Sequence, residues 1–207
     1  MSVTRTPLRL AVLGDSIAFG TGAARPEDGL GPRLTAALRA DGHDVELTVR
    51  AVPGAVSADL GAQVRRGGPA PDLAVVVVGA NDLARLVPPD RAAADLADAV
   101  RSLRAGGTDV VVVPAPDMSS IPFVPPALRP LVRAASAELQ RRQEAVAGAA
   151  GARVAAVAAH VGRSFETDPA MFAADRFHPS SAGYAVIAAA VLPFVRDAAL
   201  ARRDVVA

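Results

Sequence analysis

Five short apolar segments, separated by stretches of helical spacing, constrain the fold of this chain more than any other feature. They span residues 8–13, 45–52, 73–78, 110–113 and 153–157. Strands that alternate with helices predict a parallel sheet with helices on both of its faces. We therefore expect an α/β fold of three layers, α/β/α.

The polarity of these segments predicts their order in the sheet. Residues 73–78 and 110–113 form apolar runs without a polar side chain, apart from the aspartate that precedes each run. Such runs are typical of central strands that are buried on both faces. Residues 45–50 alternate apolar and polar side chains, which favours a strand at the sheet edge. A flavodoxin-like five-stranded parallel sheet with strand order 2-1-3-4-5 satisfies both expectations.

Three details of the intervening stretches complete the predicted architecture. Ser57 is expected to be the N-cap of a short helix over residues 58–64. Pro193 is expected to kink or split the last helix. Residues 158–177 show no clear periodicity, so we expect a long loop that returns across the end of the sheet. A loop of that length is unusual unless it is functional.

The length and composition of the chain predict one domain. A chain of 207 residues that is 51% hydrophobic can bury a sizeable core, and this length is short for two domains. No internal repeat, low-complexity linker or block of charge marks a boundary. We therefore expect a single domain over residues 1–207.

Several residue types that carry chemistry in other enzymes are missing from the sequence. There is no cysteine, which excludes disulfides, thiolate metal ligands and cysteine nucleophiles. All 22 basic residues are arginine, so no lysine can form a Schiff base or bind phosphate in a P-loop. The three histidines, His43, His160 and His178, are far apart and do not have metal-ligand spacing. We therefore expect no metal site.

Charge and hydropathy restrict the partners and the location of the protein. The net charge is +1 and the arginines are scattered, so the basic stripe of a nucleic-acid binder is absent and we expect no nucleic acid. No secretory pattern opens the sequence, and no apolar run approaches the roughly 20 residues of a membrane helix. We expect no transmembrane segment and a cytoplasmic location, while the oligomeric state stays open.

A serine and a histidine are placed to form a nucleophile and its base. Ser16 follows the first predicted strand, where the chain leaves the sheet, and alone it would be interpreted as a turn or cap residue. Near the C-terminus, Asp175 precedes His178 by three residues. A carboxylate at that spacing can accept a hydrogen bond from Nδ1–H of the ring and leave Nε2 free as a base.

Two hydrogen-bond donors for an oxyanion are predicted at the same edge of the sheet. Gly54 follows the second strand and can present an unhindered backbone N–H, and Asn81 follows the third strand and can present its amide. Each residue alone is also typical of a tight turn. In the order 2-1-3-4-5, the strands that precede Gly54, Ser16 and Asn81 are immediate neighbours, which favours a common site.

These blocks together resemble those of the SGNH, or GDSL-like, hydrolases, a family of serine esterases and lipases. The four matching blocks are Gly14-Asp15-Ser16, Gly54, Gly79-Ala80-Asn81-Asp82 and residues 175–179, in the order of the family. One departure is visible, because Ile17 stands where the motif has leucine. The resemblance implies a three-layer fold, no cofactor, hydrolysis of esters or thioesters through an acyl-enzyme, and mainly structural roles for Asp15 and Asp82.

The predicted reaction uses Ser16 as the nucleophile, His178 as the base and Asp175 as the residue that orients the base. The oxyanion hole consists of the N–H groups of Ser16 and Gly54 and the amide of Asn81. The expected partner is a small-molecule ester with a short or medium acyl chain.

Apolar residues on two late segments either wall an acyl pocket or only pack these segments onto the sheet. They are Ile121, Phe123 and Val124 in residues 114–126, and Phe165, Met171 and Phe172 in residues 158–177. Alternative functions are an acyltransferase or carbohydrate deacetylase, and a non-catalytic SGNH-like binding domain. A nucleotide binder would need a Gly-x-Gly-x-x-Gly motif after the first strand, and a receiver domain would need a lysine; both are absent.

Overall fold

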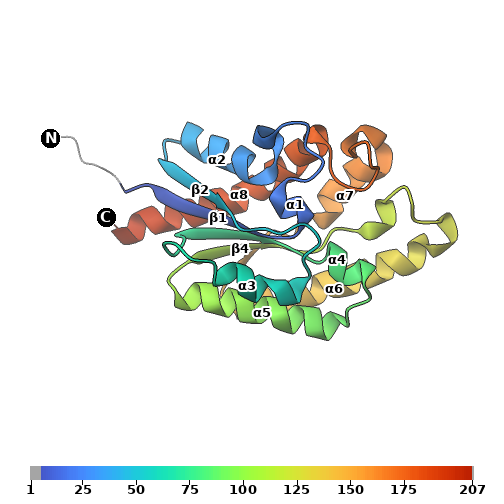
Figure 1. Cartoon of the computed structure of the whole chain (residues 1–207), viewed down its shortest axis with the longest axis horizontal. Helices are drawn as coiled ribbons and strands as arrows, with labels where there is room; N and C mark the ends of the chain where they lie inside the picture. Colours follow the sequence, from blue (N-terminus) through green and yellow to red (C-terminus); the bar gives the residue numbers. More distant parts are fainter. Residues whose placement is uncertain (1–5, 207) are drawn as a thin grey trace.

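The computed structural model describes residues 6–206 of the chain, and side chains as far as Arg202. Its centre is a parallel sheet of five strands in the order β2-β1-β3-β4-β5 (Figure 1). The strands are β1 (Leu8–Gly14), β2 (Val45–Val49), β3 (Leu73–Val77), β4 (Asp109–Val113) and β5 (Arg153–Val154). The predicted strand order is confirmed, while the predicted domain over residues 1–207 extends beyond the described residues.

Helices cover both faces of this sheet (Figure 1). One face is packed against α2 (Leu30–Ala40) and α8 (Ser181–Val206), and the other against α3 (Leu60–Val64), α5 (Pro89–Ala105) and α6 (Arg129–Ala149). The chain therefore has the predicted three layers, with one apolar core on each side of the sheet.

The register of the strands explains how one sequence supplies two cores. Val12 of β1 lies between Val49 of β2 and Val75 of β3, and Val75 lies beside Val111 of β4. Because successive side chains of a strand point to opposite faces, Val12, Val75 and Val111 belong to the core under α2 and α8, and the residues next to them belong to the other core, while Val49 at the edge is exposed. At the edge, β2 has one buried residue, Val45, followed by exposed or half-exposed ones.

The long loop predicted for residues 158–177 is wrong. The structure has a helix, α7 (Ala158–Thr167), followed by a short 3-10 turn, Pro169–Met171. No residue of α7 is fully buried, because the helix lies over a cavity and not over the sheet. Its apolar positions, among them Val161 and Phe165, do follow helical spacing, but they are few and only partly buried.

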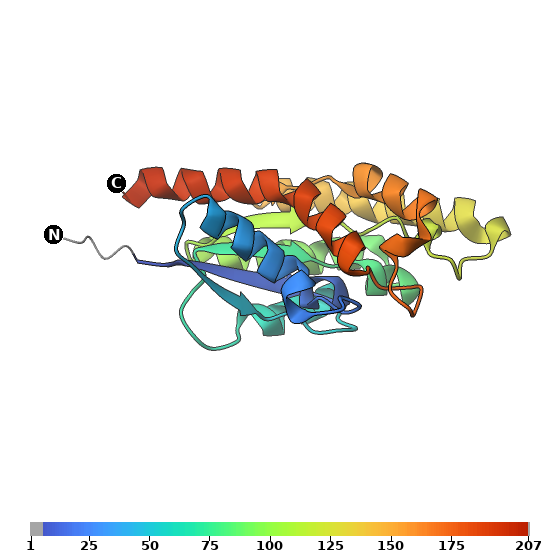
Figure 2. The ribbon, with the colours of Figure 1, turned by 90° about the horizontal axis from the view of Figure 1, so that it is seen from above.

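Two further predictions, at Ser57 and Pro193, have different outcomes. Ser57 belongs to a 3-10 turn, Ser57–Asp59, ahead of α3, and its hydroxyl donates to Asp82 at 3.2 Å, so it is not a helix cap. Of the two outcomes expected at Pro193, a kink or a split, the structure shows the first, since α8 continues across this residue and its ribbon bends (Figure 2). A proline removes one hydrogen bond of a helix, and packing of α8 against the sheet keeps the two halves together.

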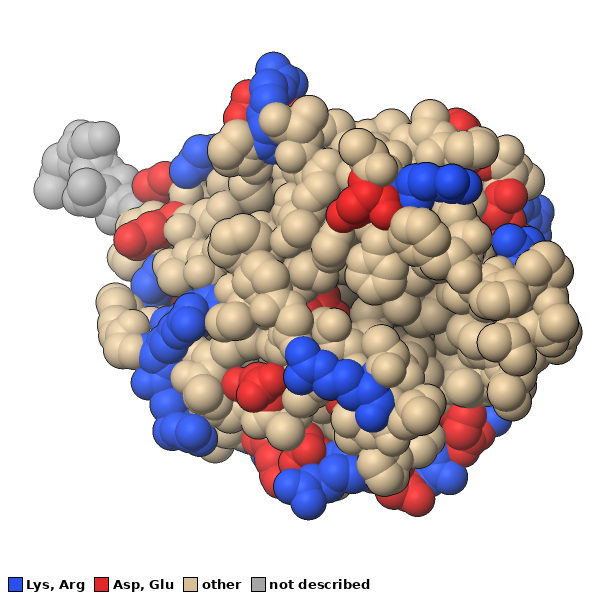
Figure 3. All heavy atoms as spheres, turned by 45° about the vertical axis from the view of Figure 1, so that its right-hand side comes forward, with Lys and Arg blue, Asp and Glu red and all other residues tan. Residues whose placement is uncertain are grey.

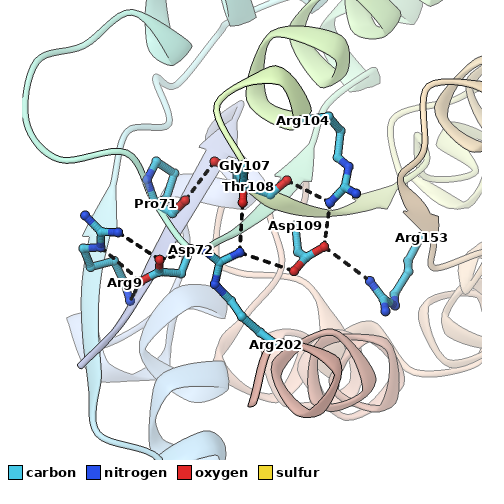
Figure 4. A network of polar contacts seen from close by, with 9 residues as sticks. All are labelled: Arg9, Pro71, Asp72, Arg104, Gly107, Thr108, Asp109, Arg153 and Arg202. Atoms are coloured by element: carbon cyan, nitrogen blue, oxygen red, sulfur yellow. Dashed lines mark hydrogen bonds and ion pairs between the residues drawn. The ribbon is translucent and has the colours of Figure 1, made fainter. Parts of the chain in front are cut away.

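An ion-pair network ties the end of α8 to the amino ends of the strands (Figure 4). Arg202 donates to Asp72 at 2.9 Å and to the carbonyl of Gly107 at 2.9 Å, and it lies 3.5 Å from Asp109. Asp72 also accepts two side-chain hydrogen bonds from Arg9, at 3.0 and 2.9 Å. The C-terminal helix is thereby linked to β1, β3 and β4 at the end opposite to Ser16.

Contrary to expectation, the residues Ser181–Arg202 of α8 are long and apolar enough to cross a membrane by length and composition, with a mean hydropathy of 1.6. In the fold, 39% of that window is buried. Tyr184, Val191 and Val195 are fully buried against the sheet. A helix that packs into a protein core passes the same test, so the packing accounts for its composition.

Candidate active site

Ser16 lies at the carboxyl end of β1, where the chain turns from the sheet into the short helix α1 (Ser16–Phe19). Asp15 caps this helix, because its Oδ1 accepts a hydrogen bond of 2.9 Å from a backbone N–H of α1. Gly14 has φ +129°, and a Cβ atom there would lie 1.7 Å from the carbonyl oxygen of Val77. The turn therefore requires glycine before the Asp-Ser pair.

A hydrogen-bonded chain joins Ser16 to two residues from the opposite end of the sequence. His178 Nε2 lies 3.0 Å from Ser16 Oγ, and His178 Nδ1 lies 2.6 Å from Asp175 Oδ2. The second oxygen of Asp175 accepts hydrogen bonds of 3.0 Å from the backbone N–H groups of Phe177 and His178. The structure thus brings together the serine, the histidine and the aspartate that the sequence singled out.

The environment of Asp175 keeps its side chain ionised. Burial raises the pKa of this carboxyl, but the hydrogen bonds from His178 and from two backbone N–H groups outweigh that effect and bring its pKa to about 2. A carboxylate accepts a hydrogen bond from Nδ1–H of the neutral ring, which leaves Nε2 unprotonated opposite the serine hydroxyl.

The segment that carries His178 is fixed by backbone contacts on both sides. The N–H of Ala173 donates to the carbonyl of His178 at 2.8 Å, and Phe172 forms an isolated antiparallel bridge with Pro179. Gly22, with φ +93°, packs against this segment, and a Cβ atom there would lie 2.8 Å from the Cβ of His178. Only glycine leaves room for the segment of His178 and Pro179 at this position.

The other two predicted residues, Gly54 and Asn81, lie on segments that hydrogen bonds connect. Gly54 lies in the turn after β2, and Asn81 lies in α4 (Ala80–Ala84), directly after β3. The amide of Asn81 donates to the carbonyl of Ala55 at 3.0 Å, and Arg85 donates to the carbonyl of Gly54 at 2.8 Å. An amide nitrogen carries two hydrogens, and the bond to Ala55 uses one of them.

Two carboxylates are buried beside the nucleophile turn. Asp15 is 1% exposed, and burial raises its pKa to about 6, assisted by the negative charge of Asp82. Within the described residues, Oδ2 of Asp15 has no hydrogen-bond partner. Asp82 accepts hydrogen bonds from the backbone N–H and the hydroxyl of Ser57, so it ties α4 to the turn after β2. Burial raises the pKa of Asp82, and the hydrogen bonds from Ser57, which lower it, only partly offset this effect.

An apolar cavity opens beside Ser16 and His178, between α7 and the segment that follows β4. It measures about 620 Å³ including its open mouth. Most of its wall is made of apolar side chains, namely Ile17, Met118, Ile121, Val161, Phe165, Phe172, Phe177 and Ile187. The corresponding end of the molecule is hollowed and its centre is mainly uncharged (Figure 3).

Only part of the apolar set proposed for an acyl pocket lines this cavity. Ile121, Phe165 and Phe172 contribute to the wall. Phe123 is 62% exposed, and neither Val124 nor Met171 belongs to the wall, so the pocket alternative does not hold for these three residues. Both alternatives therefore hold in part, since Phe165 lines the cavity and also packs against the core under α2 and α8, while Val124 packs against a small core around Met118.

Three buried polar side chains that the sequence did not single out fix the backbone around the site. Gln63 of α3 binds both the N–H and the carbonyl of Gly14, each at 2.8 Å. Gln143 of α6 binds backbone groups of the turns after β3 and β4. Tyr184 donates to the carbonyl of Thr21 at 2.8 Å. The only signal in the sequence is a polar residue at an otherwise apolar helical position.

The groups gathered around Ser16 are of the kinds that acyl transfer uses. A hydroxyl, an imidazole, a carboxylate and several donors lie at one end of the sheet, and acyl transfer by nucleophilic catalysis uses groups of these types. Among residues 6–206, the structure places no three histidine, aspartate or glutamate side chains where they could hold a metal ion together.

The sequence is similar to known proteins over most of its length. It matches the GDSL-like Lipase/Acylhydrolase family over residues 12–186. It is 36% identical over 203 residues to the GDSL-like esterase Rv1075c of Mycobacterium tuberculosis. That match covers 96% of this chain but 65% of the relative, so the chain spans slightly less than two thirds of the length of that protein.

Solved structures agree with this similarity. The fold is similar to that of TesA, with a TM-score of 0.74 and 25% identity, covering 92% of this chain and 99% of TesA. It is also similar in fold to Axe2, an acetylxylan esterase from Geobacillus stearothermophilus, with a TM-score of 0.71 and 23% identity over 90% of this chain and 93% of Axe2. With its family match over residues 12–186, this chain belongs to the GDSL-like lipase/acylhydrolase family.

Proposed function

We propose that this protein is a serine hydrolase that cleaves carboxylic esters or thioesters through an acyl-enzyme. The observation that carries the proposal is the hydrogen-bonded chain of Ser16, His178 and Asp175 at the mouth of an apolar cavity. Family membership supports the same reaction class. In this proposal Ser16 is the nucleophile, His178 the base and Asp175 the residue that orients the base.

In the first half of the reaction, His178 Nε2 takes the proton from Ser16 Oγ, and the oxygen attacks the carbonyl carbon of the substrate. The bond between that carbon and the leaving group breaks, and the protonated His178 gives its proton to the alcohol or thiol that departs. In the second half, a water molecule gives a proton to His178 and attacks the acyl-enzyme. Ser16 then regains its proton, and the carboxylic acid leaves.

The developing oxyanion would be stabilised by the N–H groups of Ser16 and Gly54 and by the Asn81 amide. The bond from Asn81 to the Ala55 carbonyl fixes the orientation of that amide and leaves its second hydrogen for the substrate. The bond from Arg85 holds the Gly54 turn by its carbonyl. Donors that are already oriented do not have to reorganise during the reaction, which is why such groups are effective.

The shape and polarity of the cavity favour an acyl chain of short or medium length. Its wall of aromatic and aliphatic side chains suits the hydrocarbon part of an ester and offers few partners for the hydroxyl groups of a sugar. Axe2 is an acetylxylan esterase, and carbohydrate deacetylation is the alternative substrate class for this chain. Butyrate and octanoate esters should therefore be hydrolysed faster than palmitate esters or acetylated xylan.

A fluorophosphonate probe tests the proposed nucleophile. The wild-type protein should be labelled at Ser16, as located by mass spectrometry of its peptides, and Ser16→Ala should not be labelled. Ser120 provides a matched control, because it lines the same cavity and its hydroxyl donates to the carbonyl of Asp117. Ser120→Ala should be labelled like the wild type, whereas an unlabelled wild type would indicate a non-catalytic binding domain.

A further inference from the structure

Exposed apolar side chains gather at the end of the molecule where the cavity opens. Within the described residues, six of the eight large exposed ones lie in segments that follow the carboxyl ends of strands. These six are Phe19, Val52, Leu86, Phe123, Leu128 and Leu131. Scattered single residues of this kind are ordinary, but a concentration beside a cavity mouth indicates a surface that is covered by something else.

Backbone strain is found in the same region. Leu86 and Arg176 have φ values of +54° and +57°, and they are the two residues other than glycine in the described chain with a left-handed backbone. Leu86 follows α4 at a position where glycine is the usual residue. Its side chain is 87% exposed, so no buried contact offsets the strain. The left-handed backbone closes α4, because the N–H of Leu86 donates to the carbonyl of Leu83 and the N–H of Val87 donates to that of Asp82. The exposed leucine side chain is not needed for this closure.

Basic side chains without acidic partners lie beside these apolar residues. Arg85 binds the carbonyl of Gly54, Arg129 binds the carbonyl of Val124 at 3.3 Å, and Arg176 lies 6.0 Å from the centre of the Phe123 ring. Within the described residues none of these three arginines forms an ion pair.

The acidic groups of this region are engaged elsewhere. Asp117 and Glu166 both pair with Arg133, and Asp175 is bonded to His178. None of these three carboxylates forms an ion pair with Arg85, Arg129 or Arg176. At the opposite end of the sheet, in contrast, the arginines lie in a network with Asp72 and Asp109 (Figure 4).

The segments that carry these residues pack against one another. A small core of Ala80, Met118 and Ile121, with Leu83 and Phe177 against it, joins α4, the segment after β4 and the turn before His178. We call the exposed residues on these segments the basic–apolar rim. It consists of Arg85, Leu86, Phe123, Leu128, Arg129, Leu131 and Arg176.

We propose that the basic–apolar rim docks onto an anionic lipid surface. Leucine and phenylalanine side chains enter the boundary between headgroups and acyl chains, while unpaired arginines attract anionic headgroups. Docking at this end places the mouth of the apolar cavity against the lipid. The consequence that esters of short or medium acyl chain dissolved in the lipid reach Ser16 directly rests on the proposed function, but the docking itself does not.

Vesicle binding by the full chain carrying Ser16→Ala tests the docking without hydrolysis. The probes are phosphatidylcholine vesicles with and without about 30 mol% phosphatidylglycerol, which gives the vesicle surface a negative charge. The protein should co-sediment with the anionic vesicles, bind the zwitterionic ones several-fold more weakly, and dissociate as the salt concentration rises.

Three variants in the Ser16→Ala background localise the contact. Leu86→Gly should lower the partition onto anionic vesicles about tenfold, since a leucine side chain no longer enters the lipid. It should also raise the melting temperature, because glycine adopts the left-handed backbone without strain. Arg176→Gln should lower the partition about fivefold. Leu200→Ser is the matched control, since Leu200 is 52% exposed near the far end of α8, and it should change nothing.

Three results would overturn the docking proposal. They are an absence of binding to anionic vesicles at low salt, an equal loss of binding in Leu200→Ser and Leu86→Gly, and a self-association that the rim variants abolish without any vesicle binding. Failure of the fluorophosphonate label at Ser16 would instead overturn the proposed function and leave the docking result standing.

Discussion

The two ends of the sheet use charged residues in opposite ways. At the amino ends of the strands, Asp72 and Asp109 are each paired with arginines, and Arg202 contacts both (Figure 4). At the carboxyl ends, Asp15 is buried with one oxygen that has no partner in the described residues, and Asp82 lies beside it. One end therefore stabilises the fold, and the other contains groups whose burial costs free energy.

The pKa values of two aspartates express this difference. Burial raises the pKa of Asp72, but its bonds with Arg9 and the charge of Arg202 outweigh that effect and lower the pKa below its ordinary range. Burial raises the pKa of Asp15 to about 6, and only backbone N–H groups and His178 oppose it. Perturbed carboxylates of the second kind concentrate at functional sites, because there the arrangement is not optimised for stability.

The largest expected effect is on catalysis at the carboxyl end. His178→Ala should lower the turnover of a p-nitrophenyl ester by about 10⁶, since the proposed base and the orienting function of Asp175 are lost together. The melting temperature should change little, because the ring is part of a surface turn. The control is His160→Ala on α7, which should retain activity. An activity of His178→Ala within tenfold of the wild type would contradict the proposed mechanism.

A smaller loss is expected from the oxyanion donor. Asn81→Ala should lower kcat by about 10²–10³, with a much smaller change in KM, because the amide acts mainly on the charge that develops in the transition state. Gln140→Ala is a matched control. The side-chain amide of Gln140 also donates a hydrogen bond to a backbone carbonyl, that of Ala115 after β4, at 2.8 Å. A rise in KM with unchanged kcat in Asn81→Ala would instead indicate a role in substrate binding.

The buried Asp15 should make stability depend on pH. Its pKa is raised from 3.8 to about 6 in the folded chain, so the folded state binds the proton more tightly and the free energy of unfolding falls as the pH rises from about 4 through 6. Asp15→Asn removes this loss. The variant should gain up to about 3 kcal/mol over the wild type at pH 7.5 and nothing below pH 4. Urea unfolding of both proteins at both pH values measures the gain. If the variant and the wild type differed by the same free energy of unfolding at the two pH values, the raised pKa of Asp15 would be refuted.

The smallest effect is expected at the amino end. Arg202→Ala should lower the free energy of unfolding by about 1–2 kcal/mol, because it removes three contacts that join α8 to the strands. Hydrolysis of a soluble ester should not change. Arg196→Ala is the control, since its pair with Asp41 is more exposed and should contribute less than about 1 kcal/mol. Loss of activity at full stability in Arg202→Ala would break the contrast between the two ends.

Much of the fold could be predicted because its signals are local. The valine runs of β3 and β4 are apolar on both faces, and the alternation in β2 marks an edge, so the strand order followed from composition. The short helix α7 escaped prediction, because its apolar face covers a cavity and carries few residues. These few positions follow helical spacing, but a pattern that short does not separate a helix from a loop.

The residues of the candidate site were predictable for a different reason. A nucleophile, a base and its orienting carboxylate must be particular residue types, and Ser16, Asp175 and His178 stand beside predicted strand ends or a helix start. Gln63 and Gln143 were not predictable, since any polar residue within a helix has the same appearance in a sequence. Their importance depends on which backbone groups the folded chain leaves unpaired.

The sequence by itself determined the layers of this protein, the order of its strands and the residue types available for its chemistry, because these follow from local polarity and from right-handed connections between parallel strands. Tertiary structure alone decided the 3.0 Å approach of His178 to Ser16, the shape of the apolar cavity and the exposure of Leu86. Those features depend on how side chains far apart in the chain fill space against one another, and packing of that kind has no signature in any single stretch of sequence.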